Sequence, residues 1–232
     1  MIIHITRHGQ VDPPALAKGE DPDYPRGDAP ISDLGRTQAR LLGQRLRELG
    51  FSGVIHSSPY RRTIETAHII SEIIDVAVVP SAPMREVVMS ETQMDGFRGA
   101  TIDELHSSFS RVDSAAHCFY PWWTSRVESP DDVEARVAPF VDQVAADGID
   151  ALLVGHGAST GGAIRHIMRH GTPDGLPHDD PGWNCALTSF RMPPNFTAIR
   201  LMDVSHLPGE WVTSNVRTRD QILAERGEEE TE

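Results

Sequence analysis

The sequence predicts an α/β fold, a three-layer αβα sandwich around a mainly parallel central sheet with an inserted lobe. Short apolar runs typical of buried strands alternate with longer segments of helical periodicity. Glycine, proline or polar residues end each run, and no internal repeat or linker divides the 232 residues. Alternation of this kind builds a sheet of parallel strands connected by helices.

The predicted elements follow one another in a regular order. The apolar runs that predict strands lie at 2–6, 53–57, 76–79 and 151–154. The segments that predict helices lie at 34–49, 60–73, 102–108, 130–147 and 160–169. Two further runs, 185–190 and 196–202, are predicted to pair as antiparallel strands.

Capping residues mark several helix boundaries. Ser32 and Ser58 are placed to cap helix N-termini, and Ser129 starts a further helix. Gly50 and Gly148 are predicted to end two helices, because glycine readily adopts the left-handed conformation that often follows the last helical turn.

We expect one domain over residues 1–224, with the inserted lobe at about 84–127. The lobe is the least regular part of the pattern. The last residues, 225–232, form an acidic stretch that is predicted to be a disordered tail.

Composition and charge narrow the function classes. The chain is 39% apolar and 24% charged, as in ordinary globular proteins. Its net charge of -13 argues against a nucleic-acid or anionic membrane surface, which needs clustered lysine and arginine. No leader or membrane-spanning segment is recognised, so we expect a cytoplasmic protein. Cys118 and Cys185 lack metal-type spacing; two free thiols are the simplest interpretation, and a disulfide stays open.

Polar motifs follow three of the predicted strands. Residues 7–9 (Arg-His-Gly) come after the first strand, 57–62 after the second and 155–157 (Gly-His-Gly) after the fourth. Since the carboxyl ends of parallel strands share one edge of a sheet, two arginines and two histidines are expected to converge there. Guanidinium groups neutralise phosphate oxygens while a nucleophile attacks phosphorus in line. The set predicts phosphoryl transfer with no metal or other cofactor.

Three segments carry a resemblance to a known family. Residues 6–10 (TRHGQ), 57–67 (SSPYRRTIETA) and 154–159 (VGHGAS) resemble, in order, the three signatures of the histidine phosphatase superfamily, the phosphoglycerate-mutase-like branch 1. The segments 31–46 and 128–140 resemble two of its helices. The likeness extends from residue 2 to about 190, and three ordered matches at strand ends are a strong signal.

The resemblance implies a role for each matching residue. His8 would be the nucleophile that becomes phosphohistidine, and Arg7 and Arg62 would clamp the phosphoryl group. His156 would complete the phosphate pocket and stabilise the transition state. Further contacts to substrate or phosphate would come from Gln10, Gly157 and Asn184.

The proton donor to the leaving group is specified less closely. Residues 84–86 (Met-Arg-Glu) resemble the family's Leu-Arg-Glu, which implies that Glu86 is the donor. The family often continues to Trp-Glu-Gly soon afterwards, whereas here the nearest match, residues 97–99 (Phe-Arg-Gly), comes later. Glu91 and Asp95 therefore stay open as alternatives.

The chemistry sets the protonation of both reacting groups. His8 must be neutral to attack phosphorus, and the flanking arginines lower its pKa. A backbone carbonyl that accepts from the other ring nitrogen would fix the tautomer. Glu86 must be protonated to act as an acid, and a nearby dianionic phosphate would raise its pKa.

We expect a metal-independent, acid-type phosphatase that hydrolyses a small-molecule phosphate monoester. A mutase is one alternative, and it must exclude water from the phosphoenzyme. The segments 11–28 and 87–127 match the family poorly, which favours hydrolysis. A non-catalytic phosphate-binding regulatory protein is the other alternative, and the sequence leaves open whether the chain forms a homodimer.

Overall fold

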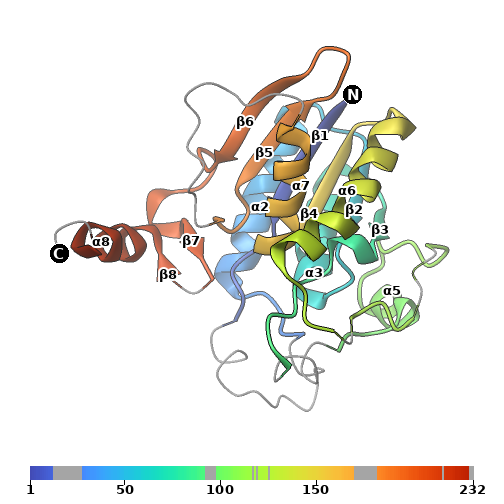
Figure 1. The fold of residues 1–232 in the computed structure, drawn as a ribbon, viewed down its shortest axis with the longest axis horizontal. Helices are drawn as coiled ribbons and strands as arrows, with labels where there is room; N and C mark the ends of the chain where they lie inside the picture. Colours follow the sequence, from blue (N-terminus) through green and yellow to red (C-terminus); the bar gives the residue numbers. More distant parts are fainter. Residues whose placement is uncertain are drawn as a thin grey trace.

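A central sheet of six strands organises the molecule, in the order β3-β2-β4-β1-β5-β6 (Figure 1). The structure is a computed structural model. It describes residues 1–12, 28–91, 98–116, 118, 120–124, 126–169, 182–215 and 217–229.

Four neighbouring strands of the sheet run parallel. They are β1 (Ile2–Arg7), β4 (Ala151–Gly155), β2 (Val54–Ser57) and β3 (Val78–Pro80). The antiparallel pair β5 (Leu187–Arg191) and β6 (Thr197–Asp203) extends the sheet beyond β1. The predicted, mainly parallel sheet is therefore confirmed, and so is the antiparallel pair.

Helices cover both faces of this sheet. The longest are α2 (Asp33–Glu48), α3 (Arg61–Ile74), α6 (Pro130–Asp147) and α7 (Gly157–Met168). The predicted caps Ser32 and Ser129 accept hydrogen bonds from the first turns of α2 and α6. Gly148 adopts the left-handed conformation after α6, at φ 71°.

Alternate residues of β4 pack into two separate cores. Successive side chains of a strand point to opposite faces of a sheet. Leu152 and Val154 pack with α2 and α3, whereas Ala151 and Leu153 pack with α6 and α7. All four side chains are buried, so β4 lies at the centre of the predicted three-layer αβα sandwich, which is confirmed.

Smaller elements lie at the two sides of the sandwich (Figure 1). The lobe contributes α5 (Ile102–Ser108), and the short η1 (Ala82–Met84) leads into it from β3. The C-terminal part forms η2 (Gly209–Trp211), β7 (Thr213–Ser214), β8 (Arg217–Thr218) and α8 (Arg219–Glu229). None of the described helices is both long and apolar enough to cross a membrane.

The structure corrects the predicted tail in part. Helix α8 continues to Glu229, so residues 225–229 are helical and not disordered. The helix is held because Ile222 is buried in a small apolar cluster and Glu225 pairs with Arg217 at 2.6 Å. Residues 230–232 lie outside the described residues.

Two helix starts also differ from the prediction. Helix α3 begins at Arg61, with Tyr60 as N-cap residue, and no side chain of that residue caps it. Ser58 is therefore not the N-cap, and its hydroxyl lies 2.8 Å from Nε2 of His156. Helix α7 begins at Gly157, earlier than the predicted start at residue 160.

Close backbone contact joins the end of β1 to the first turn of α2. A Cβ atom on Gly9 would lie 2.5 Å from the carbonyl oxygen of Gly35. A Cβ atom on Gly35 would lie closer still to the carbonyl oxygen of Gln10. No side chain fits at either position, so this packing requires both glycines.

Gly35→Ala is expected to lower the free energy of unfolding by about 1–3 kcal/mol, because its methyl group forces residues 9–10 away from α2. The same displacement should lower kcat/KM, since His8 directly precedes this segment. Urea unfolding and steady-state kinetics measure the two effects. Gly209→Ala is the control, because open space surrounds Gly209. Equal losses in both variants would contradict the argument.

Candidate active site

The carboxyl ends of β1, β2 and β4 bring the three sequence motifs together. Arg7 is in register with Gly155, and Val154 is in register with Ser57. The amide of His8 donates to the carbonyl oxygen of Gly155 at 3.0 Å, so the backbone is still held where β1 ends. The predicted convergence of the motifs at one edge of the sheet is confirmed.

His8 is buried and oriented by its own loop. Its Nδ1 lies 2.7 Å from the carbonyl oxygen of Gly9, an acceptor of the kind expected from the chemistry. Nδ1 therefore carries the proton, and the lone pair of Nε2 is left for attack. Burial, followed by Arg7 and Arg62, lowers the pKa of His8 well below its usual value. The structure thus presents a neutral imidazole.

His156 faces His8 at the start of α7. The two ring centroids are 5.3 Å apart. Nε2 of His156 lies 2.8 Å from the hydroxyl oxygen of Ser58, and Nδ1 lies 3.3 Å from Oε2 of Glu86. Burial and Arg62 lower the pKa of His156 well below its usual value, so this ring is neutral as well.

Arg62 lies in the first turn of α3 and reaches the same space. Its Nη2 is 3.3 Å from Oε2 of Glu86, and its side chain is 7% exposed. The guanidinium carbon lies 4.9 Å from the centre of the Tyr60 ring, within the range of a cation–π contact. These contacts hold the guanidinium near both histidines.

Neutral oxygen acceptors hold Arg7. Its Nη1 donates to the carbonyl oxygen of Gly182 at 2.7 Å and to the hydroxyl of Ser214 at 3.1 Å, and its Nη2 donates to Oδ1 of Asn215. Burial lowers the pKa of Arg7, and the charge of Glu86 opposes this effect. The positive charge suits a phosphate ligand.

Glu86 lies between Arg62 and His156. One carboxylate oxygen contacts both Arg62 and His156 at 3.3 Å, and the other accepts the amide of Val87 at 3.0 Å. The structure therefore brings Glu86 into contact with Arg62 and His156, and its role as proton donor stays a prediction. Glu91 is exposed, and Asp95 lies outside the described residues.

The three lesser site residues differ in what they contact. Nδ2 of Asn184 donates to the carbonyl oxygen of His8 at 2.8 Å, so it holds the backbone of the predicted nucleophile. Oε1 of Gln10 accepts from the hydroxyl of Ser32 at 2.8 Å, which turns this oxygen toward α2. Gly157 is the first residue of α7, where the helix dipole favours an anion.

Asp28 is a buried group near the site that the sequence reasoning missed. Its Oδ1 accepts the amide of Arg61 at 2.5 Å, so it supplies the cap that α3 lacks from its own N-cap residue. Burial raises the pKa of Asp28 to about 7, although Arg62 and Arg61 oppose the rise. No local pattern predicts a cap that comes from the loop before another helix.

Three residues of the site also form a candidate ligand group for a metal ion. His8, Glu86 and His156 offer ligand atoms within 4.8 Å of one another. Burial, followed by the charges of Arg7 and Arg62, lowers the pKa of both histidines, and the positive charge of these arginines opposes a second cation. The donor set therefore fits an anion such as a phosphoryl group.

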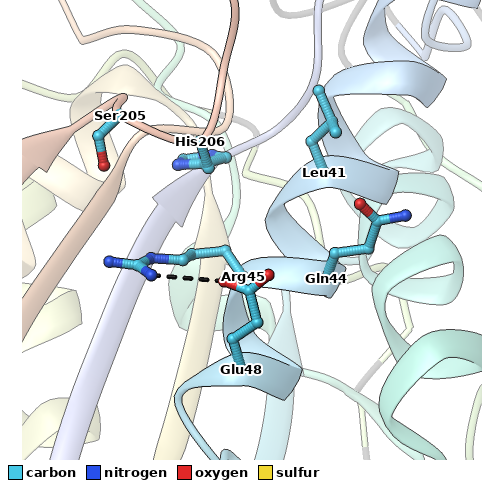
Figure 2. Close-up of a pocket in the computed structure, with 6 residues that line it drawn as sticks. All are labelled: Leu41, Gln44, Arg45, Glu48, Ser205 and His206. Atoms are coloured by element: carbon cyan, nitrogen blue, oxygen red, sulfur yellow. Dashed lines mark hydrogen bonds and ion pairs between the residues drawn. The ribbon is translucent and has the colours of Figure 1, made fainter.

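A pocket of about 330 Å³ outside this site lies between α2 and the turn after β6 (Figure 2). It is lined by Leu41, Gln44, Arg45, Glu48, Ser205 and His206. Arg45 already pairs with Glu48 at 3.4 Å, as the dashed line in Figure 2 shows. The pocket shares no residue with the site described above.

Asp28→Asn should change how stability depends on pH. The folded-state pKa of Asp28 lies above its unfolded value. The stability that protonated Asp28 contributes to the fold is therefore complete below about pH 4 and is lost as pH rises through about 7. Asparagine does not titrate, so the stability of the variant relative to the wild type should rise by up to roughly 4 kcal/mol between these limits. Urea unfolding across pH 4–8 measures the difference; a constant difference would refute it.

Known proteins resemble this chain in sequence and in fold. A model of the histidine phosphatase superfamily, branch 1, matches residues 3–204. The chain is 26% identical over 219 residues to the probable phosphoglycerate mutase GpmB of Citrobacter koseri, covering 88% of this chain and 94% of that protein.

Two solved structures extend the comparison of folds. The ecdysone phosphate phosphatase of Bombix mori has a TM-score of 0.68 and 20% identity, covering 96% of this chain and 99% of the other. A mycobacterial glucosyl-3-phosphoglycerate phosphatase has a TM-score of 0.59 and 19% identity, covering 89% and 99%. With the motifs at one sheet edge and the family match over most of its length, the chain belongs to branch 1 of the histidine phosphatase superfamily.

Proposed function

We propose that the protein hydrolyses a small-molecule phosphate monoester through a phosphohistidine on His8. The observation that carries this proposal is the state of His8. Its Nδ1 is bound to the carbonyl oxygen of Gly9, its pKa is lowered, and two guanidinium groups lie nearby. A neutral nucleophile in a positive pocket suits attack on a phosphate dianion.

In the first step, Nε2 of His8 attacks phosphorus and the bond from phosphorus to the ester oxygen breaks. Glu86, protonated, gives its proton to the leaving oxygen and becomes a carboxylate. Arg7, Arg62 and His156 stabilise the charge on the oxygens of the phosphoryl group in transfer.

In the second step, water attacks the phosphohistidine. The Glu86 carboxylate accepts a proton from this water, the bond between phosphorus and nitrogen breaks, and inorganic phosphate leaves. His8 returns to its neutral state and Glu86 to its acid form. The side chain of Glu86 is 19% exposed, which supports the access of water that hydrolysis needs.

A mutase is the second candidate, because the Citrobacter koseri relative is named a probable phosphoglycerate mutase. The two fold relatives described above are named as phosphatases, which agrees with hydrolysis but identifies no substrate. Incubation with a panel of phosphate esters separates the two reactions. Released inorganic phosphate supports hydrolysis, whereas an isomerised ester without release supports the mutase. Tight binding without turnover would support a non-catalytic phosphate-binding protein.

A radioactive phosphate monoester should label His8, and His8→Ala should abolish both labelling and turnover. Labelling should continue below pH about 6.5, the ordinary histidine pKa, because the pKa of His8 is lowered. Quenching in alkaline detergent and peptide mapping at alkaline pH locate the label, because the phosphorus–nitrogen bond of phosphohistidine hydrolyses in acid. His166→Ala is the control, since His166 pairs with Asp142 outside the site. A label that persists in His8→Ala would refute the covalent mechanism.

Glu86→Gln should slow the cleavage of esters with poor leaving groups by about 10²–10⁴-fold, because those leaving groups need a proton. Esters of p-nitrophenol, whose anion leaves unaided, should be affected much less in the first step. Kinetics with the two substrate types measure the difference. Glu91→Gln and Asp95→Asn test the alternative donors. A larger effect in either of them would transfer the role away from Glu86.

A further inference from the structure

Glu128 is a buried carboxylate outside the site described above, with a side chain 1% exposed. Its Oε1 accepts from Nη2 of Arg85 at 2.6 Å and from Nε of Arg136 at 2.9 Å. Its Oε2 accepts from Nη2 of Arg136 at 3.3 Å. The guanidinium groups of Arg85 and Arg136 therefore both bind the carboxylate of Glu128. Arg85 directly precedes Glu86 in the sequence.

Arg136 and Glu128 also hold the backbone on both sides of Glu86. Arg136 donates to the carbonyl oxygen of Pro83 through Nη1 and to that of Arg85 through Nη2, the latter at 3.0 Å. The amide of Glu128 donates to the carbonyl oxygen of Val88 at 2.9 Å. Glu86 thus lies between two anchored carbonyl groups at the root of the lobe.

We propose that Glu128, together with Arg136, is a positioning residue that holds Glu86 against Arg62 and His156 for proton transfer. The proposal rests on the proposed function, because it takes Glu86 as the proton donor. Glu86 meets these partners at 3.3 Å, and a displacement of about 1 Å is enough to slow a reaction about 100-fold.

Charge explains why the carboxylate is required. Burial and the neighbouring Arg136 lower the pKa of Arg85, and Glu128 opposes this effect. Without the carboxylate, two largely buried cations would repel each other with no ion between them. Arg85 would then move away, and it would carry the adjoining Glu86 with it.

Glu128→Gln tests the proposal, because it keeps the shape of the side chain and removes its charge. For an alkyl phosphate, kcat/KM should fall by about 100-fold. For p-nitrophenyl phosphate, the rate of phosphohistidine formation should change little, since this leaving group needs no proton. The amount of His8 label per protein reports the folded fraction, so a loss of stability is measured separately.

Two comparisons separate positioning from a general structural role. Glu134→Gln is the matched control, since Glu134 lies on the same helix and pairs with Arg165 at 3.4 Å. Glu134→Gln should leave the ratio of kcat/KM for the alkyl phosphate to kcat/KM for p-nitrophenyl phosphate unchanged. The double variant Glu86→Gln/Glu128→Gln should be no slower on the alkyl phosphate than Glu86→Gln alone, because the two residues act as one unit.

Equal losses on both substrates in Glu128→Gln, or losses that multiply in the double variant, would overturn the proposal. If Glu128→Gln yields no labelled protein, Arg136→Lys is measured in its place. It keeps the charge but lacks the forked donors for the carbonyl groups of Pro83 and Arg85. The same selective loss is expected from it. Absence of His8 label in the wild type would instead refute the proposed function.

Discussion

The parallel pairing of β1 with β4 is the constraint on which the site depends. Arg7 at the end of β1 lies in register with Gly155 at the end of β4, and the residue after each of them is a histidine. The amide of His8 still bonds to Gly155, so His8 and His156 leave adjacent strands at the same level. A slip of one residue would turn a side chain to the other face of the sheet and separate the two rings.

Burial then determines the chemical state of these rings. Desolvation is the largest cause of the lowered pKa in both His8 and His156, and the neighbouring arginines add to it. A buried imidazolium beside Arg7 and Arg62 would be costly, whereas a bound phosphate would be favoured by the same charges. One arrangement therefore accounts for a neutral imidazole at His8, the proposed nucleophile, and for a positive field that suits an anion.

The sequence was informative wherever a local pattern sets the structure. Apolar runs that end in polar motifs predicted the parallel sheet and the convergence of His8, Arg62 and His156, because the carboxyl ends of parallel strands share one edge of a sheet. The contacts of Ser58 and Asp28 were missed. Their partners lie 98 and 33 residues away in the sequence, so only the folded chain brings them together.

The predicted nucleophile and the predicted proton donor are held by different kinds of interaction. The amide of His8 is held by a backbone hydrogen bond of the sheet, and its carbonyl oxygen is held by the side chain of Asn184. Glu86 lies at the root of the lobe, where buried charges of Arg85, Glu128 and Arg136 hold the backbone. Substitutions in the lobe can therefore move the donor relative to the leaving group while the position of His8 stays the same. Under the proposed mechanism, the separation of these two supports would let the choice of leaving group vary independently of phosphoryl transfer.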